Sequence, residues 1–199
     1  MFETFEKIEL SAQSWLFLAP CWSQLTYQNV VQTIDWEQHY IQLFGRSVKE
    51  PRLSAWIADP HCSYRYSGQR RAPKAWPELL TQLRTDLSDV CQVPFNSVLA
   101  NLYRNGNDAM GWHSDDEREL GGAPMIASLS FGSERRFLLR ERSSKNKIGE
   151  LQLGHGSLLL MAGDTQLQYQ HCIAQTKRMV APRINLTFRH VVSKSASFE

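Results

Sequence analysis

The chain has 199 residues, of which 42% are hydrophobic and 21% are charged, and its formal net charge is +2. This length suits one domain with a sizeable core, and so small a net charge does not by itself indicate a nucleic-acid or membrane partner. No stretch approaches the ~18 consecutive apolar residues that cross a bilayer, and the acidic N-terminal segment does not have the layout of a signal peptide. We therefore expect a single domain over residues 1–199, located in the cytosol.

Two segments have helical periodicity. The first covers about residues 23–36 and the second about residues 76–90. In the second segment Pro77 falls in the first turn, and the apolar side chains form one stripe: Leu79, Leu80, Leu83 and Leu87. Both segments are predicted to be helices that face the core.

A basic stretch lies between the two predicted helices. It contains seven cations, opposed only by Glu50 and Asp59: Arg46, Lys49, Arg52, Arg65, Arg70, Arg71 and Lys74. Such a stretch suits contacts with phosphates, although a solvated basic face without a partner explains it equally well. Residues 41–45 and 64–68 are expected to pair as a hairpin around it.

From residue 96 onward the pattern changes to short strand-like runs separated by turns, several of them rich in glycine. The runs are SVLANLY (97–103), PMIASLSF (124–131), RRFLLRER (135–142), ELQL (150–153), SLLLMAG (157–163) and RINLTFRHVV (183–192). Regularly spaced short strands of this kind predict a β-sandwich or jelly roll. We therefore expect a mainly β fold with flanking helices (α+β).

The segment G-W-H-S-D-D-E contains two residues that suit a metal ion. His113 and Asp115 are two positions apart, so both side chains point to the same side of an extended backbone. His171 is the best placed second histidine. Two histidines and a carboxylate leave three positions of an octahedron open, the arrangement of non-haem iron(II) oxygenases.

Three alternatives to this iron site remain open. The same three ligands could hold zinc for hydrolysis. The second histidine could also be another of the remaining four: His39, His61, His155 or His190. A binding module that keeps the sandwich without chemistry is a further possibility.

A second signature lies in A-P-R-I-N-L-T-F-R. Polar and apolar residues alternate along this predicted strand, so one face is apolar and the other carries four polar side chains: Arg183, Asn185, Thr187 and Arg189. Two inward arginines are costly without anions, and a dicarboxylic keto acid would neutralise both. Asn101 and Tyr103 share a face on an earlier predicted strand and could bind the same carboxylate. An exposed edge strand whose polar face meets water is the alternative.

Four motifs together resemble the AlkB family of iron(II)- and 2-oxoglutarate-dependent dioxygenases, most closely its DNA-repair branch. They are N-L-Y-x-x-G-x-D-x-x-G-W-H-S-D-D-E, S-L-S-F-G with R-x-F-L-L-R after it, H-G-S-L-L-L-M and A-P-R-I-N-L-T-F-R. The resemblance covers most of the chain, from about residue 41 to residue 192. It implies a double-stranded β-helix, with a catalytic core over about 96–192 and a nucleotide-recognition lid over about 40–75.

The resemblance also implies the roles of individual residues in the core. Iron would bind His113, Asp115 and His171. The distal carboxylate of 2-oxoglutarate would bind three residues: Asn101, Tyr103 and Arg183. Arg189, helped by Asn185, would lie near the carboxylate that chelates iron.

The substrate residues implied by the resemblance lie mostly in the lid. Asp116, next to the acidic Glu117, would contact the target base. Tyr64 and Tyr66 would form an aromatic wall for that base, and Phe44 would wedge into a duplex. Arg46 and Arg52 would contact phosphates. The tyrosines would equally suit a core, and Phe44 a hairpin cap.

The implied reaction is oxidative demethylation of N1-methyladenine and N3-methylcytosine in alkylated DNA. It would consume 2-oxoglutarate and O₂, release formaldehyde, succinate and CO₂, and be carried out by a monomer. The same chemistry on methylated RNA or protein is the alternative.

Overall fold

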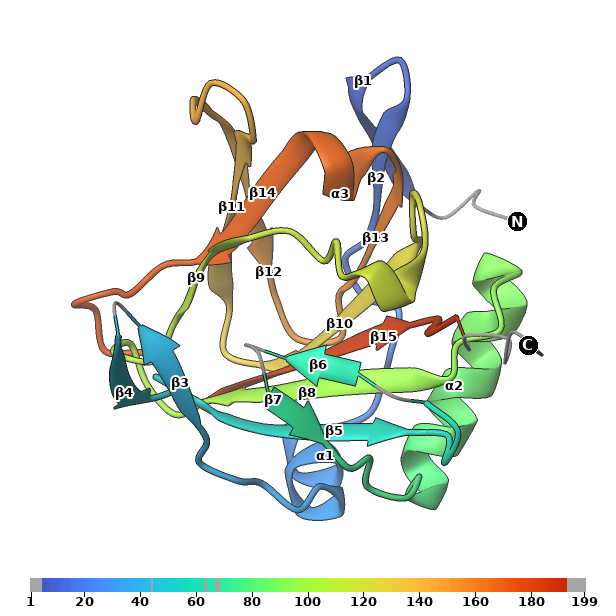
Figure 1. Cartoon of the computed structure of the whole chain (residues 1–199), viewed down its shortest axis with the longest axis vertical. Coiled ribbons are helices and arrows are strands. Elements are labelled where there is room, and N and C mark those ends of the chain that lie inside the picture. Colours follow the sequence, from blue (N-terminus) through green and yellow to red (C-terminus); the bar gives the residue numbers. More distant parts are fainter. Residues whose placement is uncertain (1–4, 44, 63, 67–68, 193–199) are drawn as a thin grey trace, which may run out of the picture.

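Two antiparallel β-sheets dominate the computed structural model, which describes residues 5–43, 45–62, 64–66 and 69–192 (Figure 1). The larger sheet contains, in spatial order, β1 (Glu6–Ser11), β2 (Ser14–Ala19), β13 (Leu158–Gly163), β10 (Ile126–Gly132), β15 (Arg183–Arg189), β8 (Ser97–Tyr103) and β5 (Leu53–Ala58). The smaller sheet contains β12 (Lys147–Leu153), β11 (Arg135–Glu141), β14 (Tyr169–Ile173) and β9 (Met110–His113). The predicted mainly β fold with flanking helices is confirmed.

The basic stretch forms two separate hairpins rather than one. The first pairs β3 (Tyr40–Leu43) with β4 (Arg46–Lys49), and the second pairs β6 (Tyr64–Tyr66) with β7 (Gln69–Arg71). The prediction that residues 41–45 pair with 64–68 is therefore wrong. Each strand pairs with its neighbour in sequence, since closing a loop of a few residues costs less entropy than closing a long one.

The helices agree with the predicted segments in position but not always in length. Helix α2 (Glu78–Cys91) begins directly after Pro77, close to its predicted start. Helix α1 (Tyr27–Thr33) is shorter than the predicted segment 23–36, because Thr26 and Asn29 form a capping box that starts the helix at this point. The remaining helices are short: α3 (Thr165–Gln168) and the 3₁₀ turn η1 (Arg118–Leu120). None of the helices in the described part of the chain has the length and apolar character required to span a bilayer.

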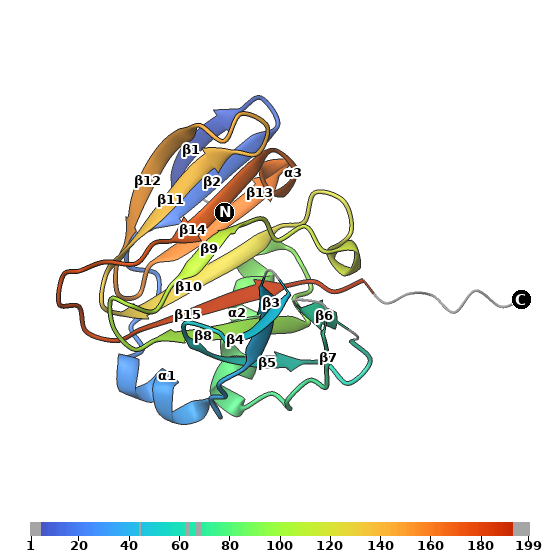
Figure 2. The ribbon, with the colours of Figure 1, turned by 60° about the vertical axis from the view of Figure 1, so that its left-hand side comes forward.

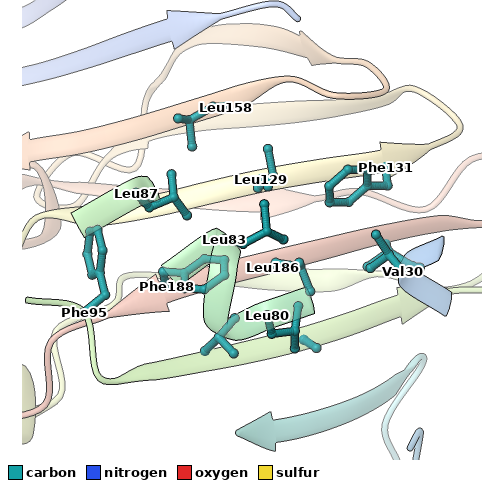
Figure 3. Close-up of a cluster of buried hydrophobic side chains, with 14 of the residues drawn as sticks. Val30, Leu80, Leu83, Leu87, Phe95, Leu129, Phe131, Leu158, Leu186 and Phe188 are labelled. Atoms are coloured by element: carbon teal, nitrogen blue, oxygen red, sulfur yellow. The ribbon is translucent and has the colours of Figure 1, made fainter. Parts of the chain in front are cut away.

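A hydrophobic core joins α2 to one face of the larger sheet. Figure 3 shows the α2 side chains beside those of the strands they pack on, and all of the following are buried: Leu80, Leu83, Leu87, Leu129, Leu186 and Phe188. Because side chains alternate along a strand, the other face of β15 is turned away from the helices and toward the smaller sheet. Figure 2 shows the two sheets from the side, with β9 and β14 opposite β10 and β15.

Candidate metal centre

The two histidines of the predicted metal site lie opposite each other on neighbouring strands. His113 on β9 pairs in register with His171 on β14, and the centroids of their rings are 4.2 Å apart. Residues directly opposite on antiparallel strands project from the same face. Asp115 follows two residues after His113, and one ligand atom from each of the three residues lies within 4.8 Å of the others. The structure thus brings the three predicted ligands together.

The donor atoms of this cluster are arranged for a cation. The Nδ1 atom of His113 lies 2.8 Å from the carbonyl oxygen of Gly111, so Nδ1–H donates there and Nε2 carries the free lone pair. The Oδ2 atom of Asp115 is buried and, among the described residues, accepts no hydrogen bond. A buried carboxylate oxygen without a donor is costly, and a metal ion would offset that cost. Two imidazoles and one carboxylate fit iron(II).

The protonation states of the cluster also suit a metal. Burial lowers the pKa of both imidazoles, to about 3 for His171. Burial acts in the opposite direction on Asp115, but the charge of Arg189 holds the pKa of its carboxyl below the usual value. Neutral imidazoles and an ionised carboxylate are the forms that bind metals.

The four rival histidines do not join such a cluster. His39 lies 3.6 Å from Glu37, the Nδ1 atom of His155 accepts from the Gly132 N–H, and the Nδ1 atom of His190 lies 2.7 Å from the carbonyl of Pro94. Across the described ranges, the one group of three possible ligands is that of His113, Asp115 and His171.

The polar face of β15 is buried beside this cluster. β15 lies between β10 and β8 in the larger sheet, with Arg183 opposite Tyr103 and Asn185 opposite Asn101. The alternative of an exposed edge strand is therefore wrong. One cavity is lined by the three possible metal ligands, by Thr187 and by the predicted co-substrate residues: Asn101, Tyr103, Arg183, Asn185 and Arg189.

Arg183 is the residue that points most directly to an anionic ligand. Its side chain is 1% exposed, and its Nη2 atom donates to the Ser130 hydroxyl at 3.0 Å. Its Nε and Nη1 atoms are buried and have no hydrogen-bond partner among the residues that the structure describes. Burial lowers the pKa of Arg183 to about 10, so the guanidinium remains protonated at neutral pH. The unpartnered nitrogens leave N–H groups that could donate charge-assisted hydrogen bonds to an anionic ligand such as a carboxylate.

Arg189 connects the arginine strand to the metal cluster. Its Nη2 atom donates to Oδ1 of Asp115, and both side chains are buried. Asn185, which was predicted to assist Arg189, donates to the Ser128 hydroxyl at 2.8 Å and accepts from the Thr187 hydroxyl. The carboxylate of Asp115 is thus held by an arginine on one oxygen, while the other oxygen remains available.

The predicted base-contacting residues follow the cluster. Asp116 is exposed, and its Oδ2 atom forms an ion pair with Nη1 of Arg142. Glu117 is half-buried, and Arg46 is exposed on β4. Phe44 lies outside the described residues. Tyr64 and Tyr66 belong to β6, but their side chains are outside the description.

Arg52 requires a correction. It was predicted to contact a phosphate, yet its side chain is 4% exposed and its Nε atom donates to Oδ1 of Asn101 at 2.7 Å. Its Nη1 atom donates to the carbonyl of Ala109, and its Nη2 atom lies 3.6 Å from the buried carboxylate of Glu50. A guanidinium enclosed in this way cannot reach a surface phosphate. The prediction is wrong because a count of charges along the sequence does not show which of them turn inward.

Comparison with known proteins matches this chain to a protein family. Residues 14–189 match the 2OG-Fe(II) oxygenase superfamily. The chain is 40% identical over 159 residues to mouse DNA oxidative demethylase ALKBH2, covering 76% of this chain and 66% of that protein. It is 37% identical over 173 residues to human alpha-ketoglutarate-dependent dioxygenase alkB homolog 3, covering 82% of this chain and 60% of that protein. The chain thus spans less than two thirds of the length of these relatives.

A solved structure supports the fold alone. The structure titled OsALKBH1 superposes with a TM-score of 0.65 over 93% of this chain and 100% of that one, at 15% sequence identity. This likeness agrees with the two-sheet architecture described above.

Proposed function

The chain belongs to the 2OG-Fe(II) oxygenase superfamily and, within it, to the AlkB family, and we propose that it repairs DNA by oxidative demethylation of alkylated bases. The observation that carries the proposal is one buried cavity that offers a His-Asp-His cluster and, beside it, a fully buried arginine with two unpartnered nitrogens. A hydrolytic zinc site needs no second anionic ligand, whereas an oxygenase that uses a keto acid does.

The cofactor of this family is iron(II), and its co-substrates are 2-oxoglutarate and O₂. We propose that His113, Asp115 and His171 hold the metal. When bound, the metal with its co-substrates supplies the oxidation that converts an N-methyl group to a hydroxymethyl group. The hydroxymethyl group then leaves the base nitrogen as formaldehyde, and the keto acid leaves as succinate and CO₂.

The work of the chain is to bind and orient the reactants. Arg183 would bind the distal carboxylate of 2-oxoglutarate through guanidinium N–H groups that have no partner among the described residues, with help from Asn101 and Tyr103. The Oδ1 atom of Asn101 accepts from Arg52, so its amide N–H groups are left to donate to the ligand. Arg189 would hold Asp115 and remain near the carboxylate that chelates the metal, with Asn185 lining the same cavity.

The proposed substrates are N1-methyladenine and N3-methylcytosine. Both bases carry a positive charge, and the methyl group blocks Watson–Crick pairing, so the damaged base is cheaper to flip out of the stack. Asp116, one residue beyond the proposed metal ligand Asp115, would bind the cationic base, with Glu117 beside it. The proposed lid over about residues 40–75 would supply the remaining contacts, from Arg46, Phe44, Tyr64 and Tyr66.

The proposal is tested by incubating the chain with matched methylated DNA and RNA oligonucleotides and following the loss of the methyl group by mass spectrometry. We expect demethylation of DNA only when iron(II), 2-oxoglutarate and O₂ are all present. Faster turnover of the methylated RNA, or of a methylated peptide tested in the same way, would show that the reaction is the proposed one but that DNA is not the preferred substrate. No loss of methyl from any of these substrates would contradict the proposal.

Replacing Asp116 with asparagine tests how the base is recognised. The variant keeps the size of the side chain but loses its charge, so a cationic base loses a charge-assisted hydrogen bond worth about 1.5–3 kcal/mol. We expect kcat/KM on N1-methyladenine to fall by about tenfold or more, and kcat/KM on the uncharged base N3-methylthymine to fall much less. Equal losses on both bases would contradict a role for the charge of Asp116.

A further inference from the structure

The carboxylate of the metal cluster lies on a segment that has left the sheet. β9 ends at His113, and residues 114–117 have no regular secondary structure. Asp115 therefore has no strand partner to fix its backbone. Its N–H instead donates to the side-chain oxygen Oε1 of Gln166 at 2.8 Å, across 51 residues of sequence. Both residues are buried, with Gln166 1% exposed.

Gln166 is itself held in one orientation. It lies in α3, whose first residue, Thr165, donates its hydroxyl to the carbonyl of Ala162 at 2.6 Å. The amide Nε2 atom of Gln166 faces the sulfur of Met161 at 3.3 Å. With its N–H₂ group turned to this weak acceptor, the amide presents its oxygen to Asp115. A buried backbone N–H needs an acceptor, and Gln166 is the one that the structure gives it.

The same part of the chain makes a second contact with this segment. The hydroxyl of Ser114 donates to the carbonyl of Tyr169 at 2.8 Å. Tyr169 is the first residue of β14, the strand that carries His171. The continuous run α3–β14 thus supplies one proposed ligand and holds the backbone of another.

We infer that Gln166 is a positioning residue that fixes the direction of the Asp115 carboxylate for the metal. This inference rests on the proposed metal site. Partners in the outer shell of a metal site commonly change metal affinity by about 10–100-fold when they are removed. Loss of the Gln166 oxygen leaves the buried N–H of Asp115 without an acceptor, so the segment moves and the carboxylate no longer meets the two histidines.

The test compares two substitutions in the same four-residue helix. Gln166→Met keeps the length of the side chain and removes the acceptor. Gln168→Met is the matched control, because the Oε1 atom of Gln168 accepts from the hydroxyls of Ser11 and Ser14 in the β1–β2 hairpin, away from the metal cluster. Mn(II) is titrated into each full-length, metal-free protein by calorimetry. We expect Gln166→Met to weaken Mn(II) binding by about 10–100-fold and Gln168→Met to change it less than twofold.

A spectroscopic measurement separates positioning from general stability. At saturating Co(II), the visible absorption bands should change in Gln166→Met, since the ligand geometry differs, and should match the wild type in Gln168→Met. If Gln166→Met does not fold, Gln166→Asn takes its place, because its shorter amide cannot reach the Asp115 N–H, and the same loss of affinity is expected. If the Gln166 variant has the metal affinity and the spectrum of the wild type, the inference about Gln166 is wrong but the proposed metal site is unaffected. Failure of the wild-type chain to bind Mn(II) or Co(II) would instead overturn the proposed metal site.

Discussion

Replacing His113 with alanine is expected to abolish demethylation, because it removes one of the three possible metal ligands that the described part of the chain brings together. His113 is a better probe than Asp115, because removing Asp115 would also remove a buried ion pair with Arg189 and so destabilise the fold. We expect metal affinity to fall by more than about 100-fold, beyond the range that the loss of an outer partner produces. Metal titration and formaldehyde release from a methylated oligonucleotide measure the two effects.

The control for this variant is His155→Ala. His155 is exposed and accepts a hydrogen bond from the Gly132 N–H, and its side chain is not among those that line the metal cavity. We expect it to bind metal and to demethylate DNA like the wild type. A fully active His113→Ala protein would show that the metal assignment is wrong.

Replacing Arg183 with methionine should separate ligand binding from folding. The guanidinium is buried with two nitrogens that have no hydrogen-bond partner in the described part of the chain. Its burial therefore lowers the free energy of unfolding of the protein without ligand. We expect the free energy of unfolding without 2-oxoglutarate to rise by about 1–3 kcal/mol. Affinity for 2-oxoglutarate should fall by at least about 30-fold, since a buried charge pair is lost. Thermal unfolding with and without 2-oxoglutarate, and calorimetric titration of the metal-loaded protein, measure both changes.

Arg135 provides the contrast. It is as buried as Arg183 to within a few per cent, but its guanidinium donates to the carbonyls of Asn105, Asp108 and Ala174. Arg135→Met should therefore lower the free energy of unfolding by about 2–4 kcal/mol, because three carbonyls lose their donors. An Arg183→Met protein that is destabilised to the same extent and still binds 2-oxoglutarate normally would contradict the role given to Arg183.

The sequence predicts the cavity well where strand alternation carries information. In β15 the polar and apolar residues alternate without exception, so one face of the strand could be assigned to the core and the other to charged ligands. The structure confirms both faces: Leu186 packs toward α2, and Arg183 lines the cavity. The pairing of His113 with His171 could not be read in this way, because register between distant strands depends on the whole sheet.

Other parts of the fold lack such a signal. β5 is buried along nearly its whole length, so its residues do not alternate, and β9 has only four residues. The β1–β2 hairpin completes the larger sheet by pairing β2 with β13, a contact between residues more than 130 positions apart. The burial of Arg52 could not be predicted from the sequence either, because the pairing of β5 with β8 brings Arg52 beside Asn101.

The most direct test of the account measures the products of one reaction together. A DNA oligonucleotide that carries N1-methyladenine or N3-methylcytosine is incubated with the chain, iron(II), 2-oxoglutarate and O₂, and formaldehyde, succinate and repaired base are quantified. We predict that the three products form in equal amounts, and that formaldehyde and repaired base disappear when either the metal or 2-oxoglutarate is left out. Repaired base that forms without succinate, or no repair by a protein that has bound both metal and 2-oxoglutarate, would contradict the account.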